Sequence, residues 1–324
     1  MAGAKKFGTF GGVFVPSALT ILGVIMYLRL GWVVGNAGLV GTIAIILIAH
    51  VISVTTGLSV SSIATDKKVK AGGIYYMLSR SLGLPIGGSI GIALFVATAL
   101  SIAMYIVGFA ESFNSIIGLN SVDMDPLERV NNLRITGTVT LLLVSTIAMV
   151  STSMAIKTQY YILGAIVLSL ISIFSGGLLI DHGFTPEAPS LFPGVNSVNM
   201  ETIFAIFFPA VTGFTAGVAM SGDLKDPKKS IPVGTMASIG VGLLVYISLA
   251  IFLSSTVDAN VLREDTNVLA KIALFSAYGA PFLMAGIWGA TLSSALGGIL
   301  GGPRILQAMS LDRVTPVSYT HLRA

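Results

Sequence analysis

The chain has 324 residues, of which 54% are hydrophobic and only 10% are charged. Because a soluble domain carries about 25% charged residues, this composition excludes a water-exposed globular surface and indicates a polytopic α-helical membrane protein. The chain contains no cysteine, which excludes disulfides, thiol catalysis and thiolate metal sites. Its net charge of +4 is distributed over loops, so we expect no nucleic-acid partner and take the lipid bilayer as its surroundings.

Apolar runs of about 20 residues, the length of a bilayer-crossing helix, recur along the whole chain. Eight spans are predicted: 13–35, 39–63, 87–118, 134–154, 158–180, 201–221, 232–256 and 280–302. No cleavable signal peptide is expected, because the first twenty residues lead directly into a full-length span.

The connections between these spans separate the basic residues by side. One side receives Lys5, Lys6, Lys67, Lys68, Lys70, Arg80, Lys157, Lys225, Lys228, Lys229, Arg304, Arg313 and Arg323. The other side receives only Arg129, Arg134, Arg263 and Lys271. The positive-inside rule therefore predicts a multi-pass protein of the cell membrane with a cytoplasmic N-terminus.

Spans 1 and 6 share a pattern. Residues 14–24 read FVPSALTILGV and residues 207–217 read FFPAVTGFTAG. Each has an aromatic residue, a proline two positions later, then a threonine and a glycine. Such a pair in corresponding positions is typical of an inverted-repeat transporter and its binding site. If span 6 restarts the pattern of span 1, the repeat unit has five helices and the second unit is incomplete after span 8.

The residues of span 6 allow two interpretations. Pro209 removes a helical donor, and Gly213 and Gly217 let the backbone open. Carbonyls released by such a break can bind a cation, and free N–H groups can bind an anion. Alternatively, Pro209 only kinks the helix and the two glycines form a face for close helix packing. The matching interruption in span 1 favours the break.

The spans contain few ionisable groups: Arg29 and Glu111 lie near outer ends, and His50 is expected to be a neutral, hydrogen-bonded packing residue. The spacing offers no acid or histidine cluster for a proton relay or a divalent metal. A bound cation must therefore use neutral oxygens, and a co-bound anion would offset its desolvation cost. The same lack of an acid, base or metal cluster argues against an intramembrane enzyme.

Span 8 carries small residues at four-residue intervals, which predict a smooth face for helix contact. They are Gly286, Ala290, Ser294, Gly298 and Gly302. Ser293 and Ser294 either bond to their own helix or offer hydroxyls to a ligand. The loop at 221–234, which follows span 6, is predicted to be a cytoplasmic turn segment. No glycine-rich stretch has the context of a nucleotide site, and no cofactor is expected.

These segments together resemble the cation–chloride cotransporters, which have the amino acid–polyamine–organocation fold. The resemblance is carried by GVFVPSALTILGVIMYLRLGWVVGNAG (12–38), TGLSVSSIATDKKVKAGGIYYMLSRSLG (56–83), AMYIVGFAES (103–112), FAIFFPAVTGFTAGVAMSGDLKDPKKSIPVGT (204–235) and ATLSSALGGILGGPRILQA (290–308). It implies a 5+5 inverted-repeat fold with discontinuous helices 1 and 6.

The resemblance also divides the chain. Residues 1–12 form a cytoplasmic N-terminus, 13–182 the first five-helix repeat, 201–302 a partial second repeat and 303–314 a cytoplasmic segment. Residues 315–324 follow no family pattern and are expected to be foreign sequence. Family members have twelve spans and one chloride site uses a tyrosine from span 10, so we expect this eight-span fragment alone to be inactive. A homodimer is left open.

Site residues are implied by the resemblance alone. A potassium site would use the main-chain oxygens of Thr20 and Ile21 and the hydroxyl of Tyr105, together with Pro209 and Thr212. A sodium site would use Leu19, Leu22, Ala290, Ser293 and Ser294. Chloride would bind at Gly23, Val24 and Ile25, and again at Gly213, Phe214 and Thr215. Many members have asparagine where this chain has Thr20, a change that a backbone ligand tolerates.

The function implied is symport of chloride with potassium and sodium. The serine pair favours sodium coupling, whereas the loop at 221–235 is closer to the sodium-independent potassium–chloride branch. An amino-acid permease on the same fold is the alternative among transporters. A non-transporting membrane accessory protein is the alternative from a different class.

Overall fold

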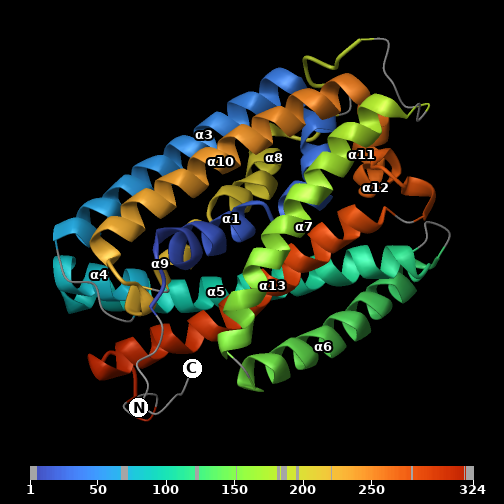
Figure 1. The fold of residues 1–324 in the computed structure, drawn as a ribbon. Helices are drawn as coiled ribbons and strands as arrows, with labels where there is room; N and C mark the ends of the chain where they lie inside the picture. Colours follow the sequence, from blue (N-terminus) through green and yellow to red (C-terminus); the bar gives the residue numbers. More distant parts are fainter. Residues whose placement is uncertain are drawn as a thin grey trace.

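The computed structural model describes residues 6–66, 72–120, 124–150, 152–180, 183, 188–194, 197–219, 221–278, 280–316 and 318. Within these residues, seven helical stretches are long and apolar enough to cross a membrane, and an eighth apolar helix, Met200–Val211, is shorter. The predicted all-helical membrane fold is therefore confirmed (Figure 1). Several residues of the predicted charge asymmetry lie outside the described residues: Lys5, Lys67, Lys68, Lys70 and Arg323.

Span 1 consists of several short pieces. They are the π-helix η1 (Phe10–Phe14), α1 (Val15–Ile21), α2 (Val24–Leu28) and the start of α3 (Leu30–Asp66). The rest of α3 is span 2, which Gly38 separates from span 1 with φ 65° and ψ 173°. A side chain at this position would also meet the backbone of Phe192, so the turn requires glycine.

The remaining spans follow the predicted order, and most of their helices are longer than predicted. The elements after α3 are α4 (Gly73–Leu82), α5 (Leu84–Ile116), α6 (Pro126–Val150), α7 (Thr152–Leu179), α8 (Met200–Phe207), η2 (Phe208–Val211), α9 (Thr215–Ala219), η3 (Ser221–Asp223), α10 (Pro227–Thr256), α11 (Ala259–Glu264), α12 (Val268–Ile272), η4 (Ser276–Tyr278) and α13 (Pro281–Leu311). The short helices α4, α11 and α12 were not predicted.

The prediction of a turn segment over 221–234 is wrong for its second half. Only the stretch up to Asp226 is non-α-helical, and α10 begins at Pro227. Proline suits the first position of a helix because its N–H would have no partner there and its φ is already helical. Pro227 therefore starts the helix, although in sequence it resembles a turn residue.

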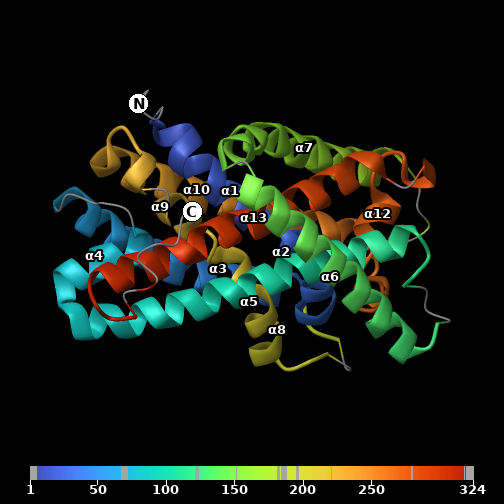
Figure 2. The same ribbon diagram turned by 90° about the horizontal axis from the view of Figure 1, so that it is seen from below.

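The first span lies at the centre of the bundle. Long helices α3 and α10 run side by side, while α5, α6, α7 and α13 form the opposite part of the molecule (Figures 1 and 2). Between them, α1 contacts α7, α10 and α13. In the most apolar part of Phe10–Leu28, 89% of the residues are buried, against 17% in α5. The broken first span is thus shielded from the bilayer by the helices around it.

Contacts at the two ends of the bundle agree with the predicted division of loops by side. At one end, the N–H of Phe7 donates to the carbonyl of Asp223 at 2.9 Å, and Thr9 bonds to Ser230 at 3.1 Å. At the other end, Arg263 donates to the carbonyl of Gly35 at 2.7 Å. Loops that the charge pattern assigns to one side therefore meet one another.

Candidate functional site

Both predicted helix interruptions are present. Helix α1 ends at Ile21, Leu22 has φ −84° and ψ 45°, and Gly23 is extended before α2 begins at Val24. In span 6, η2 ends at Val211 and α9 begins at Thr215. Helix ends leave main-chain N–H and C=O groups without their regular partners. The structure therefore contains unwound backbone inside two apolar spans, which membranes tolerate only where protein or ligand satisfies it.

The two interruptions touch each other. A β-carbon added at Gly213 would lie 2.5 Å from Thr20 Cγ2 and 2.9 Å from the Thr20 carbonyl carbon. One turn further on, a β-carbon at Gly217 would lie 2.7 Å from Val13 Cα and 2.8 Å from Ser17 Oγ. The glycines of span 6 thus provide both features considered from sequence, a break in the helix and a face for close packing.

Four of the five residues predicted for potassium lie at this junction. Thr20 and Ile21 end α1, Pro209 lies in η2, and Thr212 follows η2. Thr212 is exposed, and Thr20 and Pro209 are half-buried, so side-chain packing does not seal the junction. Tyr105 comes from α5 and is 9% exposed.

Helix α5 reaches the first span through a glycine. It packs against α2, where Gly108 leaves room for Val24. Gly108 follows Tyr105 by three residues in the same helix. Within the described residues the Tyr105 hydroxyl makes no hydrogen bond, so it is free to bind another group.

The residues predicted for sodium lie on α1 and α13, two helices that contact each other. Leu19 and Leu22 lie at the end of α1, and α13 contacts both α1 and α2. Ser293 donates to the carbonyl of Ala290 at 3.2 Å, as the own-helix interpretation predicts. Ser294 is only 8% exposed, yet its hydroxyl has no partner in the described part of the chain. An unpaired buried hydroxyl is costly, and a ligand would satisfy it.

The small-residue face of span 8 packs as predicted. A β-carbon at Gly286 would lie 2.6 Å from Ser169 Oγ and 2.8 Å from the Tyr27 hydroxyl. At Gly298 it would lie 2.7 Å from Ile102 Cγ1. This close approach places α13 between α7 and α5.

The residues predicted for chloride lie at the two helix restarts. Gly23 precedes α2, while Val24 and Ile25 form its first turn. Gly213 and Phe214 form the turn before Thr215, the first residue of α9. Ser17, which is fully buried, donates to the carbonyl of Phe214 at 2.8 Å and accepts from the N–H of Gly217 at 3.2 Å.

Three polar residues at these breaks were missed in the sequence. They are Ser17, Ser53, which donates to the carbonyl of Val211 at 2.9 Å, and Tyr246, which donates to the carbonyl of Ile21 at 2.7 Å. Each is a hydroxyl within an apolar span, but the spans carry other hydroxyls nearby, so the local sequence did not single these three out. His50 bonds to the carbonyl of Ile46 at 2.8 Å, as expected, but its Nε2 has no partner among the described residues.

An ion pair between spans 1 and 3 was also missed. Arg29 makes two hydrogen bonds to Glu111, at 3.0 and 2.7 Å, with the two side chains 34% and 18% exposed. Both residues were noted in the sequence, but their separation of 82 positions hid the pairing. Bidentate pairs of this kind fix geometry, so Arg29 ties span 1 to span 3.

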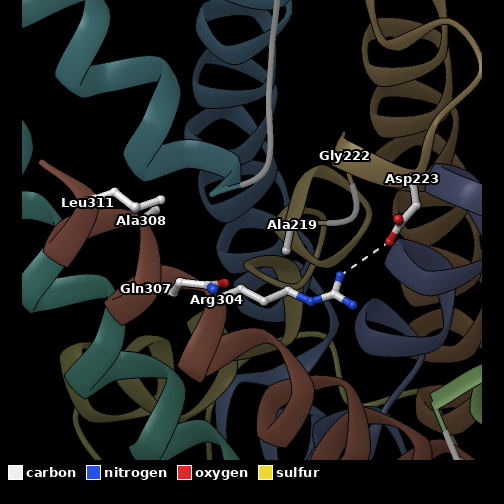
Figure 3. Close-up of a pocket in the computed structure, with 7 residues that line it drawn as sticks. All are labelled: Ala219, Gly222, Asp223, Arg304, Gln307, Ala308 and Leu311. Carbon is white, nitrogen blue, oxygen red and sulfur yellow. Dashed lines mark hydrogen bonds and ion pairs between the residues drawn. The ribbon is translucent and has the colours of Figure 1, made fainter. Parts of the chain in front are cut away.

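A small pocket lies at the opposite end, beside α9 (Figure 3). It has a volume of about 150 Å³ and is lined by Ala219, Gly222, Asp223, Arg304, Gln307, Ala308 and Leu311. Arg304 reaches Asp223 across it at 3.3 Å. In the part of the chain that the structure describes, no group of three His, Asp or Glu side chains could hold a metal ion.

Two facing interrupted helices inside a helical bundle define the architecture of an inverted-repeat secondary transporter. The amino acid permease family model matches residues 12–322, and the chain belongs to this family. That match extends through most of 315–324, whose foreign origin stays a prediction.

Individual proteins similar to this chain indicate which kind of transporter in the family it resembles. The chain is 34% identical to the bumetanide-sensitive sodium-(potassium)-chloride cotransporter of Manduca sexta, over 96% of this chain and 34% of that protein. It is 35% identical to solute carrier family 12 member 2 of Homo sapiens, over 97% of this chain and 29% of that protein. The predicted likeness to sodium/potassium/chloride cotransporters is confirmed, and the chain spans about a third of the length of these relatives.

Proposed function

We propose that the protein carrying this chain is a secondary active symporter of the cell membrane. It couples chloride transport to potassium and sodium, with its N-terminus in the cytoplasm. The observation that carries the proposal is the contact between the two helix breaks, where Gly213 meets Thr20. Unwound backbone from two helices is thereby gathered in one place at the centre of an apolar bundle.

The chemistry of this place suits alkali cations. Carbonyl and hydroxyl oxygens are the ligands of such ions, and the Tyr105 and Ser294 hydroxyls have no partner within the described residues. We assign potassium to the Thr20, Ile21, Tyr105, Pro209 and Thr212 group and sodium to the group around Ser294. The name of the Manduca sexta relative, a sodium-(potassium)-chloride cotransporter, supports this assignment.

Chloride supplies the charge that the cation site lacks. Backbone N–H groups at a helix start attract anions, and two helices restart here, α2 at Val24 and α9 at Thr215. An anion close to the cations offsets part of their desolvation cost. Because the cation ligands carry no charge, we expect cations and chloride to be taken up together.

The family model bears the description amino acid permease, so an amino acid is the second candidate substrate. The packing favours inorganic ions. Even one added methyl group at Gly213 would overlap Thr20, which leaves little room between the breaks for an amino-acid side chain. The buried polar residues that the structure describes also include no Asp or Glu that could pair with an ammonium group.

Uptake of rubidium, a potassium substitute, tests the proposal in cells that express the protein in full from its gene. We expect uptake that falls to background when external chloride is replaced by gluconate, and that falls strongly when sodium is replaced by N-methylglucamine. Rubidium uptake that is indifferent to chloride overturns the coupling. Competition by amino acids would instead establish the second candidate.

A further inference from the structure

Three buried hydroxyls each bind one main-chain carbonyl at the helix breaks. Ser17 binds the carbonyl of Phe214, Ser53 that of Val211, and Tyr246 that of Ile21. These carbonyls belong to residues at or near helix ends, where regular partners are missing. Each hydroxyl comes from a different element, α1, α3 or α10.

Only one of these carbonyls belongs to the proposed cation site. Phe214 is assigned to chloride and Val211 to no ion, but Ile21 is assigned to potassium by its main-chain oxygen. The hydroxyl of Tyr246 lies 2.7 Å from that oxygen. A carbonyl oxygen has two lone pairs, so it can accept one hydrogen bond and still coordinate a cation.

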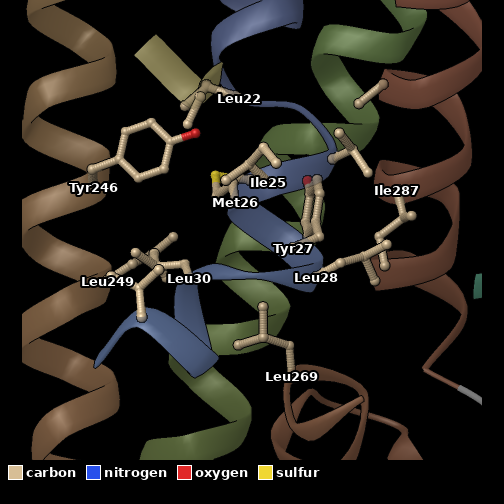
Figure 4. Close-up of a cluster of buried hydrophobic side chains, with 14 of the residues drawn as sticks. Leu22, Ile25, Met26, Tyr27, Leu28, Leu30, Tyr246, Leu249, Leu269 and Ile287 are labelled. Atoms are coloured by element: carbon tan, nitrogen blue, oxygen red, sulfur yellow. The ribbon is translucent and has the colours of Figure 1, made fainter. Parts of the chain in front are cut away.

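Packing holds the Tyr246 side chain in one place. The residue is fully buried, and its ring meets Phe207 edge-on with ring centroids 5.2 Å apart. On another side the His50 ring lies 6.3 Å away. From α10 the hydroxyl points at the end of α1, beside Leu22 (Figure 4). A ring enclosed in this way has a fixed hydroxyl position.

The backbone around Tyr246 also favours a close approach to Ile21. Gly242 precedes Tyr246 by one turn of α10, and a β-carbon there would lie 2.6 Å from Ile21 Cγ2. Glycine at this position therefore lets α10 reach the end of α1. The glycine and the tyrosine together determine where the Ile21 peptide unit lies.

We infer that Tyr246 is a positioning residue of the potassium site. Its hydroxyl holds the Ile21 carbonyl oxygen at the junction of the breaks, with one lone pair bonded to Tyr246 and the other left for the cation. Without this bond, the last peptide unit of α1 gains freedom that potassium binding must remove. This inference rests on the proposed function, because it assumes that potassium binds at Ile21.

Replacing Tyr246 by phenylalanine tests the inference, since the ring contacts with Phe207 and His50 are kept. In the protein expressed in full from its gene, we expect the Tyr246→Phe variant to raise the rubidium concentration for half-maximal uptake about threefold to tenfold, the range of one neutral hydrogen bond. The chloride concentration for half-maximal uptake should change less than twofold. Rates are divided by the amount of protein at the cell surface.

Tyr27→Phe is the matched control. Tyr27 is also buried, at 2% exposure, and its hydroxyl bonds to the Ser169 side chain at 2.5 Å, not to a main-chain carbonyl of either break. We expect its half-maximal rubidium concentration to stay at the wild-type value. Equal rubidium dependence of Tyr246→Phe and Tyr27→Phe overturns the inference.

Two further measurements distinguish failure of this inference from failure of the proposed function. If wild-type protein shows no chloride-dependent rubidium uptake, the proposed function itself fails. If Tyr105→Phe raises the half-maximal rubidium concentration and Tyr246→Phe does not, only the role of Tyr246 fails. Should the Tyr246→Phe variant not reach the surface, purified protein in detergent replaces the uptake assay. There the variant should be stabilised less than wild-type protein when potassium chloride replaces choline chloride at the same concentration, and an undiminished stabilisation overturns the inference.

Discussion

The contact between the two helix breaks makes Gly213→Ala a decisive substitution. The added β-carbon would lie 2.5 Å from Cγ2, 2.7 Å from Cβ and 2.9 Å from the carbonyl carbon of Thr20. Carbon atoms pack best at about 3.5–4.0 Å, so the overlap is close to 1 Å. The nearest atoms include main chain, which a side-chain rotation cannot move. Gly213 has no positive φ, so the penalty is purely steric.

Overpacking of this kind costs about 1–3 kcal/mol, which corresponds to roughly a 5- to 150-fold change in an equilibrium constant. We therefore expect Gly213→Ala to lower the thermal stability of the purified protein and to reduce chloride-dependent rubidium uptake per molecule at the surface. Both effects arise because the breaks must move apart to admit the methyl group.

Gly240→Ala is the control for the loss of a glycine. It lies in α10, where an added β-carbon would meet nothing within 4 Å. Alanine in a helix interior is favoured over glycine by about 0.5–1 kcal/mol, so this variant should be as stable as wild type or slightly more so. If Gly213→Ala matches Gly240→Ala in both stability and uptake, the described junction of the breaks is refuted.

Two other substitutions probe separate parts of the structure. Ser294→Ala should raise the thermal stability of the protein in sodium-free buffer, because it removes an unpaired buried hydroxyl that costs about 1–3 kcal/mol. It should also abolish the stabilisation that added sodium gives. A variant that is still stabilised by sodium would contradict the sodium site. At the other end of the bundle, Tyr75 is fully buried and donates to Asp312 at 2.9 Å. Burial, followed by the contacts with Asp312, raises the pKa of Tyr75 from 10.0 to about 12. A raised pKa in the folded state favours the neutral form, so its contribution to stability is complete below pH 10 and is lost as pH rises toward 12. Alkaline melting of wild type and Tyr75→Phe should therefore diverge in this range, with the variant losing less, and parallel curves would show that Tyr75 does not titrate as described.

The breaks could be predicted because their causes are local. Proline, threonine and glycine within a few positions weaken a helix whatever surrounds it, and the repetition of this pattern at Pro16 and Pro209 pointed to both places. The small-residue face of α13 was equally readable from its four-residue spacing. Local backbone chemistry thus located the site along the chain.

The partners of the unwound backbone could not be predicted in the same way. Tyr246 and Ile21 are 225 positions apart, and Ser17 and Phe214 are 197 apart. No periodicity joins such residues, since helix packing alone brings them together. The start of α10 at Pro227 was misjudged for a different reason, because proline suits both a turn and the first position of a helix.

Ser17 has a mechanical consequence. One hydroxyl of α1 both donates to the carbonyl of Phe214 and accepts from the N–H of Gly217. Sliding α1 past α9 would break both hydrogen bonds at once, and within an apolar bundle little water is present to replace them. Helices α1 and α9 should consequently move as a single rigid body, so that any relative motion takes place at their boundary with the long helices around them.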